Sequence, residues 1–407
     1  MNRTRINLER LLADHEELSL IGRKTSGGVC RRAFDPEDMK ARRWFLDKLA
    51  EAGIPGRVDA AGNLIGRIGP LSGPAVVSGS HLDTVDGGGF YDGALGVLCA
   101  LEALRVIKEN ALDRVPFEVW AFSDEEERFL GFLGSLAICG QITGERGMAV
   151  ADEGGLTLAE AMRSAGLDAA MIGRARRAPE DIKYFMELHI EQGPLLERDD
   201  CALGLVELVK ADYRYGITIH GRRDHAGSPM FGRLDPLKAG VRIIERFARE
   251  VQAVGDPENT FTVGVFEVNP GLQTVIPESV YFTVDIRAPD RQSLAFLEEH
   301  LKIMLREESQ GLVSDFQIIM REDQVTFDSV VLAAVEESLD ETGRSWRRIM
   351  SGPGHDCQVM GRYVPSGMIF VASVGGRSHC PEEFSRPEDI EAGANALLNT
   401  MLKLAER

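Results

Sequence analysis

Histidines and carboxylates gather at the ends of short apolar runs in this sequence of 407 residues. His81 and His189 each lie at the end of such a run, and His81 is followed by Asp83 and, after three glycines, by Asp92. Imidazole nitrogen and carboxylate oxygen together suit zinc, or manganese, cobalt or nickel where availability decides. The pattern therefore predicts a metal site, with a glycine-rich turn carrying solvated acids as the open alternative.

Further candidate ligands follow two other apolar runs. Asp124, Glu125 and Glu126 come directly after the run at 115–122, and His379 lies in the last glycine-bearing loop. Consecutive side chains at a strand end point to different sides, so one glutamate can bind a metal while the other acts as a base. Two ions about 3.5–4 Å apart would activate a bridging water and polarise a carbonyl. Taken alone, the acidic stretch favours an ordinary solvated charge run.

The elements around these residues must bring them together, and their order predicts an α/β fold. Short apolar or alternating runs at 63–69, 75–80 and 115–122 are separated by turns and by a helical pattern at 94–110. This βαβ order predicts a mostly parallel sheet with helices on both faces. Ligands of such sheets bind outside the carboxyl ends of the strands, which is where the polar residues fall.

The pattern changes after residue 210, where we expect an inserted domain of βαββαβ, ferredoxin-like order. Its expected elements are a strand at 213–221, a helix at 236–251, strands at 260–268 and 280–287, a helix at 290–308 and a strand at 314–320. We therefore predict a catalytic domain at 1–210 and 326–407, interrupted by a lid or dimerisation domain at 211–325. Continuation of the main sheet is the alternative.

Composition narrows the class of function. The formal net charge of −18 argues against a nucleic-acid partner, because nothing would neutralise phosphates. A charged N-terminus and the lack of a run of about 20 apolar residues predict a cytoplasmic protein without a membrane partner. The six cysteines contain no CxxC pair, which favours reduced thiols. His15 and His300 lie in charged helical stretches, where we expect them to be solvated.

Seven motifs, taken in order, resemble the amidohydrolase branch of the M20 metallopeptidase superfamily, which includes N-carbamoyl-L-amino-acid hydrolases, allantoate amidohydrolases and β-ureidopropionases. The resemblance spans nearly the whole chain, and HIEQGP is characteristic of this branch. The motifs are HLDTV with YDGALG, DEE, MELHIEQGP, HAGSPM, VIP with DIR, SGPGHD, and GGRSHCPEE.

The resemblance implies a role for each matching residue. It also implies the reaction step, in which a hydroxide that bridges two metal ions attacks the carbonyl carbon of the substrate. His81 and His189 would bind one ion, Glu126 and His379 the other, and Asp92 would bridge them. Asp83 would orient His81, and Glu125 would be the general base. The residues implied at the substrate are Gln192, His225, Thr274, Arg287 and His355. Of these, His225 would donate to the oxyanion from the partner subunit of a homodimer, and Arg287 would hold a substrate carboxylate in a bidentate fork.

Departures from the family pattern keep two alternatives open. Thr274 stands where the family usually has Asn, which leaves the exact ureido or amide carboxylate open. The acidic motif is shorter than usual, so a shift by one would make Glu126 the base and Glu127 the ligand. The predicted reaction is cleavage of a linear C–N bond of an N-carbamoyl-L-amino acid or related ureido acid. Allantoate, N-acyl amino acids or dipeptides are alternative substrates. An inactive binding relative and a nucleotide-binding enzyme are the competing classes.

Overall fold

The computed structural model describes residues 4–143, 145, 150–253, 259–309 and 311–407. The chain forms two compact units. Unit 1 consists of Met1–Glu207 together with Thr326–Arg407, and unit 2 consists of Leu208–Val325. Unit 1 is therefore built from two segments that are separated in the sequence by the whole of unit 2. The catalytic role of unit 1 and the lid or dimerisation role of unit 2 remain predictions.

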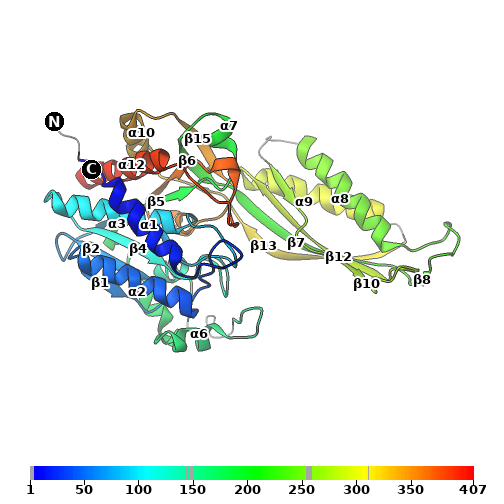
Figure 1. The fold of residues 1–407 in the computed structure, drawn as a ribbon. Helices are drawn as coiled ribbons and strands as arrows, with labels where there is room; N and C mark the ends of the chain where they lie inside the picture. Colours follow the sequence, from blue (N-terminus) through cyan, green and yellow to red (C-terminus); the bar gives the residue numbers. More distant parts are fainter. Residues whose placement is uncertain (1–3, 144, 146–149, 254–258, 310) are drawn as a thin grey trace. The chain divides into compact units, whose positions relative to one another are not determined.

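Unit 1 contains a nine-stranded sheet in the order β1-β2-β4-β3-β5-β16-β6-β14, with β15 beside β6 (Figure 1). The four strands β4, β3, β5 and β16 run parallel to one another, whereas β1, β2 and β6 pair antiparallel with their neighbours. The prediction of a mostly parallel sheet is confirmed for its centre. The strands are β1 Gly56–Val58, β2 Leu64–Ile68, β3 Ala75–His81, β4 Phe117–Phe122, β5 Ile182–Ile190, β6 Leu203–Val209, β14 Val325–Thr326, β15 Trp346–Ser351 and β16 Ser366–Val371.

Helices cover both faces of this sheet. Successive side chains of a strand point to opposite faces, and β3, β4 and β16 are buried at every position, so both faces must be covered. Met186, Leu188 and Ile190 of β5 join the apolar cluster of α1, α3, α10 and α12, while Phe185 packs against Trp120 on the other side, where α4 and α11 contact the sheet. The helices are α1 Leu8–Leu20, α2 Pro36–Glu51, α3 Ala94–Glu109, α4 Leu133–Ile138, α6 Leu158–Ser164, α7 Leu195–Arg198, α10 Ser329–Thr342, α11 Asp356–Gly361 and α12 Pro387–Glu406, with 3-10 turns at Ala169–Ala175, Pro179–Asp181 and Val374–Gly376.

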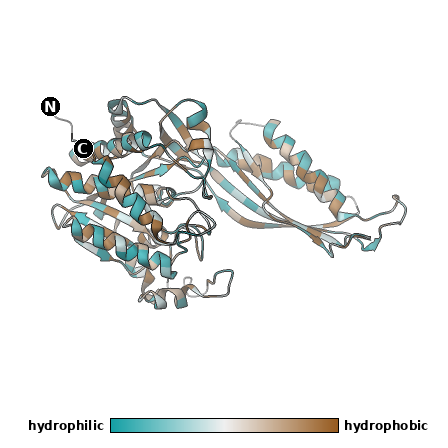
Figure 2. Ribbon diagram, viewed as in Figure 1, coloured by the Kyte–Doolittle hydropathy of each residue, from teal (hydrophilic) through white to brown (hydrophobic). Residues whose placement is uncertain are grey.

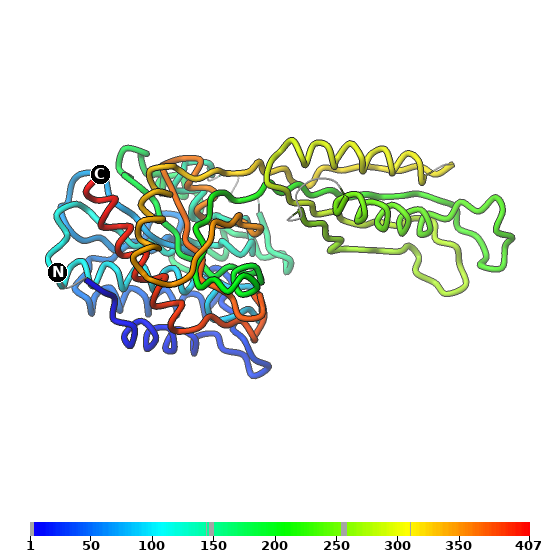
Figure 3. Tube along the Cα trace, turned by 90° about the horizontal axis from the view of Figure 1, so that it is seen from above, coloured from blue at the N-terminus to red at the C-terminus, as the bar shows by residue number. Residues whose placement is uncertain are grey.

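Unit 2 is an antiparallel sheet in the order β10-β12-β7-β13, with β9 also paired to β12 and a separate two-stranded ladder of β8 and β11. Helices α8 and α9 lie side by side (Figures 1 and 3), and polar and apolar residues alternate along both (Figure 2). Their buried apolar residues pack on β7 and β12. The elements are β7 Ala211–His220, β8 Asp224–His225, α8 Pro236–Ala253, β9 Thr260–Thr262, β10 Phe266–Asn269, β11 Val275–Ile276, β12 Ser279–Ala288, α9 Arg291–Glu308 and β13 Val313–Glu322.

The prediction of a single strand at 260–268 is wrong in detail, because the structure has two strands there. The chain leaves the ladder around Gly264, where the backbone N–H of Val265 donates to Oγ1 of Thr283 at 3.0 Å. A side-chain hydrogen bond thus replaces one ladder bond, while the N–H of Thr283 still donates to the carbonyl of Val265 at 3.1 Å. Regular pairing with β12 resumes at Phe266. With β9 and β10 counted as one interrupted strand, the main elements of unit 2 follow one another as β-α-β-β-α-β.

Expectations about single residues had mixed outcomes. All six cysteines are free, as predicted. The expectation of a solvated His15 is wrong, because its ring is buried and one nitrogen lies 2.9 Å from the carbonyl oxygen of Phe90. Burial lowers the pKa of His15 to about 4. Among the residues that the structure describes, no helix combines the length and apolar character needed to cross a bilayer.

Candidate metal centre

Four parallel strands deliver the predicted ligands of unit 1 to one edge of the sheet. His81 is the last residue of β3 and His189 is the last but one of β5. The acidic loop with Glu125 and Glu126 follows β4, and His379 lies in the loop after β16. These strands are direct neighbours, so residues far apart in the sequence are placed at the carboxyl ends of the same four strands.

Asp92 lies between the histidines and divides its two carboxylate oxygens among them. Oδ1 is 3.5 Å from Nε2 of His81 and 3.1 Å from Nε2 of His189. Oδ2 is 3.1 Å from Nε2 of His379. Asp92 is only 4% exposed, so these contacts are made away from bulk water. A carboxylate in this arrangement can serve two cations at once, one through each oxygen.

The two glutamates of the acidic loop also lie near different histidines. Oε2 of Glu125 lies 3.6 Å from Nε2 of His81, and Oε1 of Glu126 lies 3.5 Å from Nε2 of His379. Glu127 is exposed. Among the described residues, four groups have ligand atoms within 4.8 Å of one another: His81 with Asp92 and His189, Glu187 with His189 and His355, His81 with Glu125 and Glu126, and Asp92 with Glu126 and His379.

Backbone carbonyls orient the two buried histidines. Nδ1 of His81 lies 2.9 Å from the carbonyl oxygen of Asp83, and Nδ1 of His189 lies 2.9 Å from that of Ile190. A carbonyl only accepts, so Nδ1 carries the hydrogen and Nε2 carries the lone pair that could bind a metal. In the structure Nε2 of His189 accepts the backbone N–H of Gly93 at 3.2 Å. Asp83, which was predicted to orient His81, contacts that histidine through its backbone carbonyl, and its carboxylate accepts the backbone N–H groups of Glu126 at 3.1 Å and of Glu125 at 3.4 Å. Asp83 therefore contacts His81 through its backbone and holds the acidic loop with its side chain.

Unusual backbone conformations shape the loops around the ligands. Gly93 has φ +60°, and a Cβ built there would lie 2.4 Å from the His81 ring, so only glycine fits beside this histidine. Asp124, Gln192 and His379 adopt φ between 53° and 57°, a region that residues with a side chain seldom occupy. Asp124 stabilises its own turn by accepting backbone N–H groups from the three residues 128–130. Such conformations concentrate at functional sites.

The electrostatics of the cluster favour bound cations. Burial, together with the charge of Asp92, raises the pKa of Glu126 to about 7, and burial raises the pKa of Glu125 well above its ordinary value. The hydrogen bond to Asp92 raises the pKa of His379 to about 9. Several buried carboxylates thus repel one another, and divalent cations would remove that repulsion. The donor set of imidazole nitrogens and carboxylate oxygens fits two such ions, whose binding would displace protons.

Two residues predicted to contact substrate lie against this cluster. Nε2 of Gln192 donates to Oδ2 of Asp92 at 2.7 Å. The ring of His355 is buried, and its centroid lies 4.5 Å from that of His189. Its Nε2 is 3.0 Å from Oγ of Ser351. His355 is the N-cap residue of helix α11, but its side chain makes no capping hydrogen bond.

The other three predicted substrate residues belong to unit 2. His225 is exposed in β8 and pairs with Val275 of β11, and the neighbouring Ala226 donates its N–H to the carbonyl of Thr274 at 2.9 Å. Arg287 donates to both oxygens of Asp285 at 3.1 Å. His225 and Thr274 are thus neighbours at the β8–β11 ladder. The guanidinium of Arg287 is engaged by Asp285, which lies in the same strand, β12. Their roles in substrate binding remain predictions.

Several residues that contact the cluster were not predicted from the sequence, although they lie within the motifs named above. Glu383 is 3% exposed and accepts from the backbone N–H of Asp92 at 3.0 Å, and Oγ of Ser378 lies 3.0 Å from Oδ2 of Asp92. Glu187 is also buried and accepts from Oγ of Ser80 and from the N–H of Cys357. The available signal was their position within the motifs that carry His189 and His379, but nothing local distinguishes them from solvated polar residues.

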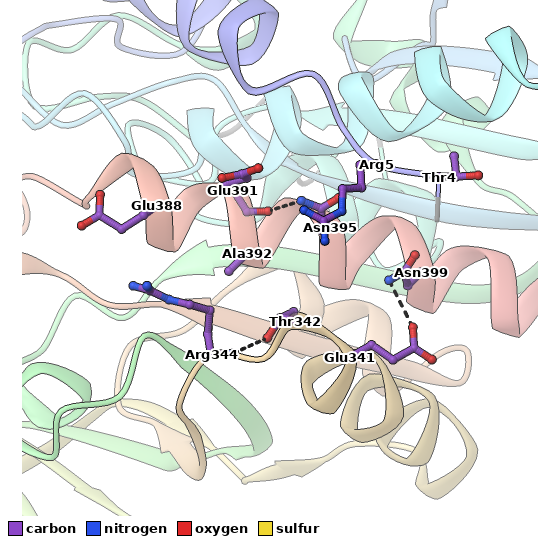
Figure 4. A pocket seen from close by; sticks show the side chains of 10 residues that line it. All are labelled: Thr4, Arg5, Glu341, Thr342, Arg344, Glu388, Glu391, Ala392, Asn395 and Asn399. Atoms are coloured by element: carbon purple, nitrogen blue, oxygen red, sulfur yellow. Dashed lines mark hydrogen bonds between the residues drawn. The ribbon is translucent and has the colours of Figure 1, made fainter. Parts of the chain in front are cut away.

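A separate surface hollow of about 170 Å³ lies in unit 1 between α10 and α12 (Figure 4). None of the candidate metal ligands lines it. Its polar groups bond to one another, as in the hydrogen bonds from Asn399 to Glu341 at 3.3 Å and from the N–H of Arg344 to Thr342 at 3.1 Å. We therefore place the chemistry at the histidine cluster and not in this hollow.

An α/β sheet that gathers histidines and carboxylates at the ends of its parallel strands is the arrangement expected of a metal-dependent enzyme. Residues 77–403 match the peptidase family M20/M25/M40, and the chain belongs to this family. It is 35% identical to an N-carbamoyl-L-amino-acid amidohydrolase of Paenarthrobacter aurescens, over 97% of this chain and 98% of the relative. It is 34% identical to an allantoate amidohydrolase of Bacillus subtilis over the full length of both. A crystal structure of a hydantoinase/carbamoylase family amidase from Burkholderia multivorans superposes with a TM-score of 0.90 at 34% identity, covering 99% of each chain.

Proposed function

We propose that this protein is a metal-dependent amidohydrolase that cleaves a linear C–N bond of an N-carbamoyl-L-amino acid or a related ureido acid. The observation that carries the proposal is the division of the Asp92 oxygens between His81 with His189 on one side and His379 on the other. This arrangement supports two cation sites that share one carboxylate. Glu125, which is close to His81 and outside the set proposed to hold the second ion, is then available for proton transfer.

The proposed chemistry assigns a separate task to each group. Two divalent ions, when bound, would lower the pKa of a water and polarise the scissile carbonyl. Glu125 would take the proton from the attacking water and deliver it to the leaving nitrogen. His81 and His189 would hold one ion, and Glu126 with His379 the other. With an N-carbamoyl amino acid the products would be the amino acid, carbon dioxide and ammonia. Zinc fits the donor set best, and manganese, cobalt or nickel fit it as well.

The substrate class is tested by a panel of compounds on metal-replete enzyme. N-carbamoyl-L-amino acids, allantoate, N-acyl amino acids and dipeptides would be compared by the release of ammonia and of amine. We expect ammonia from a ureido acid. Allantoate is the second candidate, favoured by the full-length relative of that name. Release from dipeptides alone would contradict the ureido assignment, and no turnover with any metal would favour an inactive binding protein.

Replacing Arg287 by Lys is expected to raise KM about 10-fold with little change in kcat. We propose that its guanidinium binds the substrate carboxylate, which would displace Asp285 from the bidentate fork that it now occupies. Lysine keeps the charge and loses the fork, at a cost of about 1.4 kcal/mol for a tenfold effect. The matched control is Arg291→Lys, whose side chain is 68% exposed. Equal KM values for both variants would leave Arg287 as a partner of Asp285 only.

We also propose that the enzyme is a cytoplasmic homodimer in which His225 of one subunit serves the site of the other. The free cysteines support a reducing compartment. Light scattering is expected to give the mass of two chains. Mixing an inactive Glu125→Gln chain with an inactive His225→Ala chain should restore part of the activity, because one of the two sites in a mixed dimer is then intact. A monomer in solution, or no restoration despite mixed dimers, would contradict the proposal.

A further inference from the structure

Glu383 holds the backbone on which Asp92 is carried. Its carboxylate is buried, and Oε1 accepts the backbone N–H groups of Tyr91 at 2.8 Å and of Asp92 at 3.0 Å. The chain fits closely around it, because a Cβ added to Gly89 would lie 2.1 Å from this carboxyl group. Glu383 comes from the loop after β16, so a segment near the end of the chain fixes the turn that presents Asp92.

Ser378 extends this contact to the carboxylate of Asp92. Its Oγ lies 2.7 Å from Oε2 of Glu383 and 3.0 Å from Oδ2 of Asp92. Oδ2 is the oxygen that faces His379, and it also accepts from Nε2 of Gln192 at 2.7 Å. Oδ1 instead faces His81 and His189. Ser378 has one hydroxyl hydrogen, so it donates to Glu383 or to Asp92 at any moment while its Oγ contacts both. Ser378 and Gln192 therefore act on the oxygen that would serve the ion of Glu126 and His379.

We propose that Glu383 and Ser378 are positioning residues that set the affinity of the ion shared by Asp92, Glu126 and His379. The inference rests on the two-ion centre of the proposed function. Residues that orient a metal ligand typically change metal affinity or activity by about 10–100-fold when replaced. Removing the Glu383 carboxylate also leaves the backbone N–H groups of Tyr91 and Asp92 without this acceptor, so the turn carrying Asp92 would relax. The ion at His81 and His189 should be affected less, because Oδ1 lies on the opposite side of the carboxylate from Ser378.

The test counts bound metal directly. The parent, Glu383→Ala, Ser378→Ala and a control, Glu382→Ala, would be titrated with zinc in equilibrium dialysis, and bound metal would be measured by mass spectrometry. Glu382 is the neighbouring residue, but its side chain is 64% exposed and pairs with Arg377. We expect the parent and the control to bind two equivalents alike. In the Glu383 and Ser378 variants the first equivalent should bind as in the parent and the second about 10–100-fold more weakly, and excess zinc should restore kcat.

Three results would overturn this inference. Both variants could bind the two equivalents as the parent does, both equivalents could weaken together in Ser378→Ala, or activity could stay low with both sites filled. If circular dichroism shows that Glu383→Ala is unfolded, Ser378→Ala decides, because it removes one hydroxyl and leaves the backbone bonds of Glu383 in place. A parent that binds fewer than two ions would overturn the two-ion centre itself. That failure appears in the parent, whereas failure of the inference alone appears only in the variants.

Discussion

Replacing Glu125 by Gln is expected to lower kcat by about 10²–10⁴-fold while two metal ions remain bound, because general acid–base catalysis contributes a factor of that size. The amide keeps the shape of the side chain and loses the ability to accept a proton. The metal content should be unchanged, because we assign the metal ligands to other residues. Glu125 lies 3.6 Å from Nε2 of His81, and we do not count it among the ligands. Steady-state kinetics and metal analysis of the same preparation measure both expectations.

The matched control is Glu127→Gln, two residues further along the same loop. Its side chain is exposed and belongs to none of the candidate metal groups among the described residues, so we expect activity close to that of the parent. The pair also decides between the two alignments of the acidic motif. If Glu125→Gln kept its activity while Glu127→Gln lost metal, Glu126 would be the base and Glu127 the ligand.

Replacing Asp92 by Asn is expected to remove at least one ion per chain and to lower activity by more than about 10²-fold. Residues that merely orient a ligand cost 10–100-fold when changed, so loss of a shared ligand should cost more. Asparagine offers one oxygen and no charge, whereas the carboxylate of Asp92 presents Oδ1 to His81 and His189 and Oδ2 to His379. Metal stoichiometry at fixed zinc concentration, together with kcat, measures the effect.

Asp86→Asn provides the control for this variant. Asp86 lies in the same loop, but its side chain is 63% exposed and pairs with Lys24. Its replacement should leave metal content and activity unchanged. Retention of two tightly bound ions in Asp92→Asn would contradict the bridging role. A loss of metal in both variants would point to a general disturbance of the loop.

The sequence carried enough information to predict the α/β fold and the residues that meet at the sheet edge. Apolar runs ending in His81 and His189 could be identified as strands, and the order of the elements predicted a parallel sheet. Parallel strands place their carboxyl ends together, so proximity of the ligands followed from topology. The position of Asp92 after a run of glycines indicated a tight turn, and Gly93 at φ +60° is the glycine that the His81 ring requires.

What could not be predicted depends on contacts between segments far apart in the sequence. Glu383 contacts Asp92 across the fold, and its neighbour Glu382 has the same side chain in an exposed position. From composition and periodicity alone, the same environment would be predicted for both glutamates. The same reason explains His15, which is covered by the 90–91 segment although its own helix is rich in charge. It also explains Asp83, because whether a carbonyl or a carboxylate meets His81 depends on the path of the backbone.

The position of β16 has a consequence for the order in which the protein can mature on the ribosome. This strand lies between β5 and β6 in the sheet, yet it is synthesised after both of them and after the whole of unit 2. The sheet must therefore stay open on one side of β5 until unit 2 has emerged, and His379 emerges later still. A nascent chain would hold His81 and His189 long before it could complete a second cation site. We expect the second cation site to be completed only after unit 2, β16 and the loop that carries His379 have all been synthesised.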